Sequence, residues 1–180
     1  LKDLPFCWGE IEECGKDPLE NARQKALAYY RICGQPVFSQ DSGLYIEGLP
    51  KERQPGVHVR RVNGVNLTDE QMRKYYKKIA AEFGGRCVAQ YQNAICLVFS
   101  ENEIYEARGG ALNWKKFWLM TEERPQRMEG FPLDAICADY RTGRHFYDGE
   151  ATMPEEEGDG VRDFFRNALK QHEMRNKIEK

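Results

Sequence analysis

The sequence lacks the patterns that mark membrane proteins, nucleic-acid-binding proteins and repeat proteins. No apolar run approaches the roughly 20 residues that a membrane-spanning helix requires, so we expect no membrane partner. The formal net charge is only −2 at pH 7, without the basic excess typical of nucleic-acid binding, so no nucleic-acid partner is expected. Internal repeats and low-complexity segments are also missing. A globular domain that acts on small molecules or proteins remains.

The six cysteines form neither a C-x-x-C pair nor a zinc-type grouping with histidine. Several lie in apolar sequence, such as Cys96 within residues 95–97 and Cys137 within residues 136–138. We interpret them as buried free thiols, which suit a reducing compartment. No signal peptide is visible, and the expected location is the cytoplasm.

Length and patterning indicate a single domain of the mixed α/β class over residues 1–180. A helix is predicted from Asp17 as N-cap and Pro18 at the first position to Gly34. A second helix is predicted over 68–83, with Thr68 and Gln71 as a capping box. Strands are predicted at 36–39, 86–100, 104–113, 114–121 and 135–140. Irregular connections with one short helix are predicted at 43–66, and a last helix from about 161.

Glu20 and Asp41 are the most informative residues, because one helix and one strand separate them and their carboxylates can converge. With Lys25 nearby, such a pair suits a metal-bound phosphate. Structural interpretations stay open. Glu20 also fits a capping box with Asp17, Asp41 fits an Asx turn at the exit of the strand, and Lys25 fits a solvated helix position.

Four blocks of sequence occur in the order seen in the inosine triphosphate pyrophosphatases, which this chain resembles over about residues 10–148. The blocks are Glu20-Asn21-Ala22 with Lys25-Ala26, Asp41-Ser42-Gly43, Pro55-Gly56-Val57 with Arg61, and Glu129-Gly130-Phe131 with Asp134-Ala135-Ile136. The resemblance implies an elongated, twisted mixed β-sheet with flanking helices and two lobes around a central cleft. It also implies a homodimer, with the aromatic segment 114–118 as either interface or core strand.

The activity that the resemblance implies is hydrolysis of nucleoside triphosphates, including non-standard purine forms, to a monophosphate and pyrophosphate. Glu20 and Asp41 match Mg²⁺ ligands, and Asp41 also matches the acceptor of a proton from the attacking water. Lys25 and Ser42 match phosphate-binding residues. Phe131 and Asp134 match the segment that holds sugar and base, where an aromatic ring can stack. By themselves, Phe131 also fits a core position and Asp134 a turn.

The sequence departs from the family pattern in four places. The usual N-terminal strand and its Thr/Ser-x-Asn-x-x-Lys loop do not occur in these residues, and Gln40 stands where a second carboxylate is common. Leu133 replaces an aromatic residue. Near the C-terminus, the family has a Lys and a Ser-His-Arg motif that bind the base, and this chain offers Arg162 or Arg166 in that segment instead.

Two functions follow from these matches and departures. The first is a magnesium-dependent nucleoside triphosphate pyrophosphatase with altered base preference, favoured by the retention of both Glu20 and Asp41. The second is a nucleotide-binding or scaffold protein of the same fold without turnover, favoured by the missing loop and the altered base segment.

Overall fold

The computed structural model of the chain describes residue 11, residues 14–149 and residues 159–178, with only the backbone of Asp159. It separates into two compact units. The first unit comprises Leu1–Ser42, Gln92–Asn113 and Glu156–Lys180, and the second comprises Gly43–Tyr91 and Trp114–Glu155. The boundary falls inside two strands, β1 (Val37–Ile46) and β4 (Arg86–Ser100). Whether the whole chain is a single domain stays a prediction.

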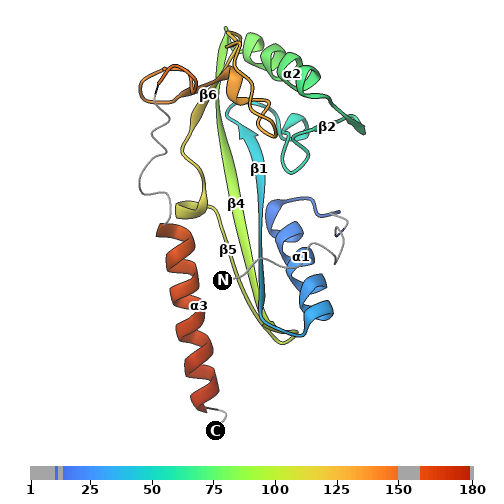
Figure 1. Cartoon of the computed structure of the whole chain (residues 1–180), viewed down its shortest axis with the longest axis vertical. Coiled ribbons are helices and arrows are strands. Elements are labelled where there is room, and N and C mark those ends of the chain that lie inside the picture. The colour runs from blue at the N-terminus through green and yellow to red at the C-terminus, as the bar shows by residue number, and fades with distance from the viewer. Residues whose placement is uncertain (1–10, 12–13, 150–158, 179–180) are drawn as a thin grey trace. The chain divides into compact units, whose positions relative to one another are not determined.

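Helix α1 (Pro18–Cys33) begins and ends where the sequence predicts (Figure 1). The Asp17 carboxylate accepts hydrogen bonds from the backbone N–H groups of Leu19 and Glu20, which satisfies donors that have no partner within the helix. Gly34 adopts a left-handed conformation with φ 63°, and this ends the helix. Ala22 and Ala26, four residues apart, pack against Cys96 and Val98 in the core of the first unit.

The hairpin predicted in the first unit is present. β4 pairs antiparallel with β5 (Glu103–Arg108), with Leu97 opposite Tyr105. The predicted strand at 104–113 is too long, because Gly109 and Gly110 have positive φ angles and lead into the 3₁₀ helix η3 (Gly110–Leu112).

Helix α3 (Asp159–Ile178) confirms the helix predicted from about residue 161. Its Phe165 ring meets Phe38 edge-on at 5.1 Å between centroids, and its His172 ring stacks on Phe99 at 3.9 Å. His172 Nδ1 also lies 2.9 Å from Glu103 Oε1. These contacts attach α3 to the strands of the first unit.

Strand β1 corrects the prediction that the chain leaves the strand at residues 40–43. It continues to Ile46, because the residues beyond the polar stretch, Leu44 and Ile46, are buried in a core. Leu44 exchanges two backbone hydrogen bonds with Gly56, of 2.9 and 3.0 Å. A Cβ atom at Gly43 would lie 3.0 Å from the carbonyl carbon of Gly56, so the close approach of these two segments favours glycine at residue 43.

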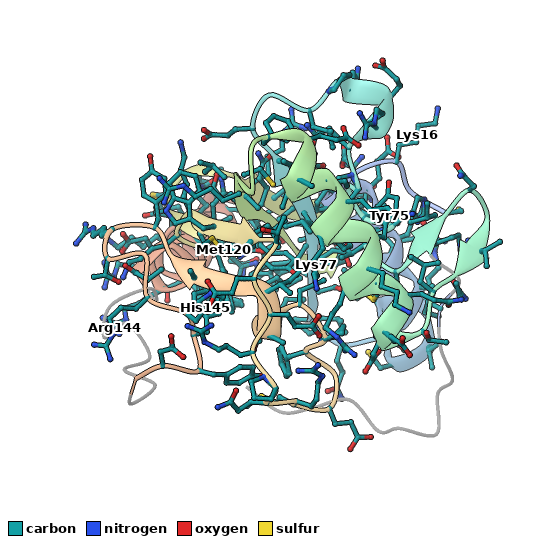
Figure 2. All side chains as sticks on the ribbon, turned by 90° about the horizontal axis from the view of Figure 1, so that it is seen from above. Lys16, Tyr75, Lys77, Met120, Arg144 and His145 are labelled. Carbon is teal, nitrogen blue, oxygen red and sulfur yellow. The ribbon has the colours of Figure 1, made fainter. Side chains whose placement is uncertain are left out.

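In the second unit, helix α2 (Asp69–Glu82) carries the predicted capping box, with Thr68 and Gln71 bonded reciprocally. Its buried face packs on β6 (Phe117–Met120) and the 3₁₀ helix η4 (Asp134–Ile136). Figure 2 shows the side chains, with Tyr75 and Lys77 labelled on α2 and Met120 on β6. This packing buries Tyr76 and Leu119 completely.

The hydrogen-bonded strand order is β1-β4-β6-β7, with β5 also on β4 and β7 at Cys137–Asp139. β6 pairs antiparallel with both β4 and β7. A small hairpin of β2 (Arg61–Val62) and β3 (Val65–Asn66), together with the 3₁₀ helix η2 (Lys51–Arg53), occupies part of the region predicted to be irregular. These elements confirm the mixed α/β class.

Three of the described cysteines, Cys87, Cys96 and Cys137, are buried free thiols, as predicted, whereas Cys14 is exposed. Burial raises the pKa of Cys87 to about 11 and that of Cys96 to about 12. Cys7 lies outside the described residues. Within the part of the chain that the structure describes, none of the helices combines the length and apolarity needed to span a bilayer.

Candidate functional site

The predicted site residues fall into two groups. Glu20, Lys25, Asp41 and Ser42 all belong to the first unit, where the side chains of Lys25 and Asn21 contact Asp41. Phe131 and Asp134 belong to the second unit. The expected phosphate-binding and base-binding residues are therefore carried by different units.

Asp41 lies on β1 and receives two contacts from one side of α1. Lys25 Nζ is 2.8 Å from Asp41 Oδ1, and Asn21 Nδ2 donates to Asp41 Oδ2 at 3.2 Å. Asn21 and Lys25 are four residues apart and therefore neighbours on the helix surface. The side chains of Lys25 and Asp41 are only 19% and 12% exposed. The interpretations of Asp41 as an Asx turn and of Lys25 as a solvated residue are both wrong.

Glu20 is an exposed carboxylate in the first turn of α1. Its Oε2 accepts a hydrogen bond of 2.7 Å from the backbone N–H of Lys16, while its own N–H donates to Asp17 Oδ1 at 3.0 Å. Glu20 therefore helps to cap the helix, through Lys16, the residue before the N-cap. A negative charge at this end is also favoured by the helix dipole. This structural role leaves the carboxylate at the surface.

Ser42 follows Asp41 and is held by a buried amide. Its Oγ lies 2.7 Å from Asn93 Oδ1, and Asn93 Nδ2 donates to the carbonyl of Leu112 at 2.6 Å. Because the amino group of Asn93 faces a carbonyl, its oxygen is the acceptor for Ser42, and the Ser42 hydroxyl is the donor. In this arrangement the hydroxyl proton of Ser42 is directed at Asn93.

In the second unit, Phe131 is 55% exposed, so its interpretation as a core residue is wrong. Asp134 begins η4, and its backbone N–H donates to Phe131 O at 3.3 Å. Burial raises the pKa of the Asp134 carboxyl above its ordinary value. Leu133, which replaces the family's aromatic residue, is 5% exposed and packs in the core. An exposed ring and a partly buried carboxyl thus stand three residues apart.

The structure places two further residues at the site, Asn21 and Asn93, which are 2% and 4% exposed and to which no role was predicted. A signal was present for Asn21, because it lies in the buried stripe of α1 with Ala22 and Ala26. An amide at such a position needs hydrogen-bond partners inside the protein. Arg166, proposed as a base-reading residue, pairs with Asp163 at 2.7 Å on α3.

The donor set can be tested against Mg²⁺. Among the residues with described side chains, no three His, Cys, Asp or Glu residues gather closely enough to form a metal cage. Mg²⁺ is commonly held by one or two carboxylates, with water and substrate phosphates completing the octahedron. Glu20 and Asp41 provide carboxylates of the type that this mode uses. In this structure the Lys25 ammonium balances the negative charge of Asp41.

Comparison with known proteins links the chain to one family. Residues 1–113 match the model of the Ham1 family. A dITP/XTP pyrophosphatase of Malacoplasma penetrans is 33% identical over 111 residues, 61% of this chain and 54% of that protein. One from Brucella melitensis is 31% identical over 160 residues, 83% of this chain and 66% of that protein. The chain thus spans about half to two thirds of the length of these relatives.

Solved structures resemble the fold more completely. A HAM1 protein from Coxiella burnetii superposes with a TM-score of 0.66 and 25% identity, over 93% of this chain and 83% of that one. The Ham1 protein of Staphylococcus aureus gives a TM-score of 0.57 at 23% identity, over 96% and 82% of the two chains.

Proposed function

The chain belongs to the Ham1 family, and on this premise we propose that it hydrolyses nucleoside triphosphates to a nucleoside monophosphate and pyrophosphate. Relatives that match it are dITP/XTP pyrophosphatases, so non-standard purine nucleotides are the proposed substrates. The observation that carries the proposal is the arrangement at Asp41, where Lys25 and Asn21 each contact one carboxylate oxygen. A scaffold without catalysis has no evident need of a partly buried ion pair between Lys25 of α1 and Asp41 of β1.

Asp41 is the proposed acceptor of the proton from the water that attacks the α-phosphorus. Both of its oxygens are held, so its carboxylate plane is fixed, yet each oxygen retains a further lone-pair site. Transfer of a phosphoryl group depends on positioning and charge neutralisation more than on covalent catalysis. A residue with a fixed orientation suits that requirement.

Lys25 is proposed to contact the triphosphate as well as Asp41, because its ammonium has three donors. Ser42 is proposed to contact a phosphate oxygen through its backbone N–H. Glu20 and Asp41 are the proposed residues for Mg²⁺, which when bound supplies charge neutralisation and orientation of the phosphates.

Phe131 and Asp134 are the proposed contacts for the base and sugar. An exposed phenyl ring stacks on any base at a gain of about 1–3 kcal/mol, without distinguishing one base from another. Because Leu133 is buried, it does not replace the family's aromatic contact. We therefore propose a relaxed base preference.

The location and assembly of the protein are also proposals. Buried free thiols at Cys87, Cys96 and Cys137 suit the cytoplasm. Trp114 is 51% exposed, and large exposed aromatic residues are enriched at protein interfaces, which supports a homodimer. Light scattering after size exclusion, on the wild type and on Trp114→Ser, tests the assembly.

The test of the activity is to incubate the protein with Mg²⁺ and a panel of triphosphates, including ITP, dITP, XTP, ATP and GTP, and to measure pyrophosphate. We expect release that stops on addition of EDTA and resumes with excess Mg²⁺. Monophosphate and pyrophosphate must appear in equal amounts, since release of inorganic phosphate alone indicates attack at a different phosphorus. Failure with every base, together with retained nucleotide binding, supports the scaffold function instead.

A further inference from the structure

The buried polar residues of the described chain are few, and two of them contact consecutive residues of the proposed site. Asn21, Asn93 and His145 are the polar residues that are almost completely buried. Asn21 donates to Asp41, and Asn93 accepts from Ser42. Burying an amide is unfavourable unless its hydrogen bonds are made. The contacts of both amides with Asp41 and Ser42 therefore need an explanation.

Asn21 connects Asp41 to the segment before α1. Its Oδ1 accepts a hydrogen bond of 2.8 Å from the backbone N–H of Gly15, which directs its amino group toward Asp41 Oδ2 at 3.2 Å. A Cβ atom at Gly15 would lie 2.5 Å from Asn21 Oδ1, so a side chain at residue 15 would displace the amide. The backbone of Gly15 thereby fixes which end of the Asn21 amide faces Asp41.

Asn93 connects Ser42 to the turn at η3. Its Nδ2 donates to Leu112 O at 2.6 Å, and its backbone N–H donates to Asn113 Oδ1 at 3.0 Å. With its amino group committed to a carbonyl, the amide presents its oxygen to the Ser42 hydroxyl at 2.7 Å. The carbonyl of Leu112 thus fixes the orientation of the Asn93 amide, and its oxygen faces Ser42.

We propose that Asn21 and Asn93 are positioning residues that set the hydrogen-bond polarity of Asp41 and Ser42 for the reaction. The inference rests on the proposed function and assigns two residues to it. Asn21 gives Asp41 Oδ2 a donor and fixes the plane of the carboxylate that accepts the proton. Asn93 gives Ser42 an acceptor and fixes the direction of its hydroxyl. Supporting residues of this kind typically change activity by about 10–100-fold when they are lost.

The two asparagines should have different kinetic effects. Asn21→Asp keeps an acceptor for Gly15 but replaces the donor by a carboxylate facing Asp41, so we expect kcat to fall by about 10–100-fold with little change in KM. Asn93→Asp keeps an acceptor for Ser42 but places a carboxylate oxygen against the carbonyl oxygen of Leu112, so the side chain should rotate. We then expect KM to rise by a larger factor than kcat falls. Asn66→Asp, the same change at an exposed residue of β3, is the matched control and should leave both constants unchanged.

Positioning is distinguished from general support of the fold by combining variants. In an Asp41→Asn background, Asn21→Asp should cause no further loss, because there is no carboxylate left to orient. A merely structural role would lower kcat by the same factor in both backgrounds. Equal factors therefore overturn the inference for Asn21.

A second measurement needs no turnover and no altered asparagine. The side-chain amide resonances of Asn21 should shift in Asp41→Asn, and those of Asn93 should shift in Ser42→Ala, but neither should move in Asp69→Asn. Unmoved amide resonances overturn the inference. A wild-type protein that releases no pyrophosphate overturns the proposed function, whereas normal kcat and KM in both asparagine variants overturns only the role given to these residues.

Discussion

Lys25 Nζ and Asp41 Oδ1 are 2.8 Å apart, so the proposed proton acceptor forms an ion pair. The Asp41 side chain is 12% exposed and the Lys25 side chain 19%, so the two opposite charges face each other in a partly buried position. Lys25 is also the proposed phosphate contact. One contact thus links the proposed proton acceptor to the proposed phosphate contact.

Asp41→Asn should reduce kcat by about 10²–10⁴-fold, the range typical for loss of a general base. The substitution keeps the shape of the side chain and removes its charge and its ability to accept the proton. Pyrophosphate release under saturating Mg²⁺ and substrate measures the effect, and the urea midpoint reports folding. Asp69→Asn, an exposed aspartate on α2 paired with Arg60, is the control. Turnover at the wild-type rate in Asp41→Asn would remove Asp41 from this role.

Lys25→Met should have opposite effects on two ligands. Removing the ammonium leaves the Asp41 carboxylate without its cation, so Mn²⁺ used as a probe for Mg²⁺ should bind more tightly to the nucleotide-free protein. Binding of the triphosphate should weaken at least tenfold, because a phosphate contact is lost. Electron paramagnetic resonance measures free Mn²⁺, and calorimetry with a non-hydrolysable triphosphate measures the second effect. Lys74→Met, which breaks an exposed pair with Glu70, should change neither, and equal Mn²⁺ affinity in Lys25→Met would contradict the expectation.

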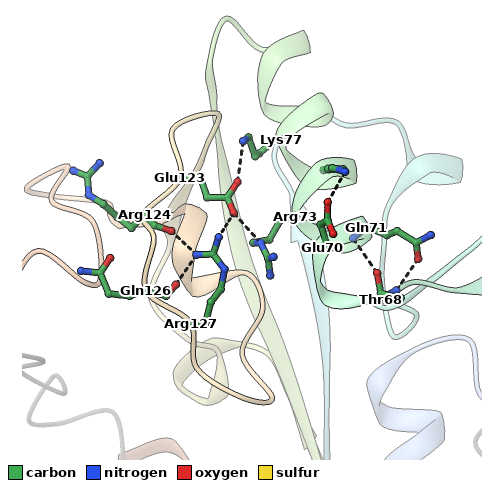
Figure 3. Close-up of polar contacts among 10 residues, drawn as sticks. Thr68, Glu70, Gln71, Arg73, Lys77, Glu123, Arg124, Gln126 and Arg127 are labelled. Atoms are coloured by element: carbon green, nitrogen blue, oxygen red, sulfur yellow. Dashed lines mark hydrogen bonds and ion pairs between the residues drawn. The ribbon is translucent and has the colours of Figure 1, made fainter.

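Glu123→Gln should destabilise the second unit by about 1–3 kcal/mol, because three cations lose their common carboxylate. Glu123 accepts from Arg73 and Arg127 through Oε1 and from Lys77 through Oε2 (Figure 3). Burial opposes ionisation of Glu123, but the Lys77 hydrogen bond and the surrounding charges outweigh it and lower the pKa. Urea denaturation measures the loss of stability. The difference between wild type and variant should be smaller in 0.5 M NaCl, because salt screens the charges.

The control for this effect is Glu70→Gln on the same helix. Its exposed pair with Lys74 spans i,i+4, and such pairs contribute about 0.2–0.5 kcal/mol. If both substitutions cost the same, the convergence of cations on Glu123 adds nothing to stability.

Asp134→Asn should make the protein more stable at pH 7. The ordinary carboxyl pKa is 3.8, and burial raises that of Asp134, so the folded protein holds the proton more tightly than the unfolded chain. Stability at this residue therefore falls as pH rises above 3.8, and the variant avoids that loss. Denaturation from pH 3 to pH 7 should show a gain that vanishes at the acid end. The same variant should bind nucleotide more weakly if Asp134 contacts the substrate.

Asp139→Asn should show the reverse dependence. Hydrogen bonds from the backbone and hydroxyl of Thr142 and the backbone of Arg141 outweigh partial burial and lower the pKa of Asp139. Its stabilisation is present above the ordinary value of 3.8 and is lost as pH falls through the folded value. If the two variants changed stability in the same direction at pH 7, one of the two assignments would be wrong.

The predictions that the structure confirms concern local chemistry. Asp17 and Gly34 bound α1, and Thr68 with Gln71 caps α2, because each of these groups satisfies backbone partners within four residues. The order of helices and strands follows from the periodicity of apolar residues. The predicted length of β1 was wrong. The polar residues Ser39 to Ser42 resemble the end of a strand, but the buried residues Leu44 and Ile46 follow them and extend it.

Sequence alone determined the helix ends, the mixed α/β class and the identity of Glu20, Lys25, Asp41 and Ser42 as candidates. Only the tertiary structure decided how these candidates are held. The contact of Asn21 with Asp41 spans 20 residues, and that of Ser42 with Asn93 spans 51. No local pattern encodes such contacts, because they depend on the packing of α1 and of the β4–β5 hairpin region against β1. The direction of each buried amide is set in turn by a backbone group, at Gly15 and at Leu112, that packing brings within hydrogen-bond distance.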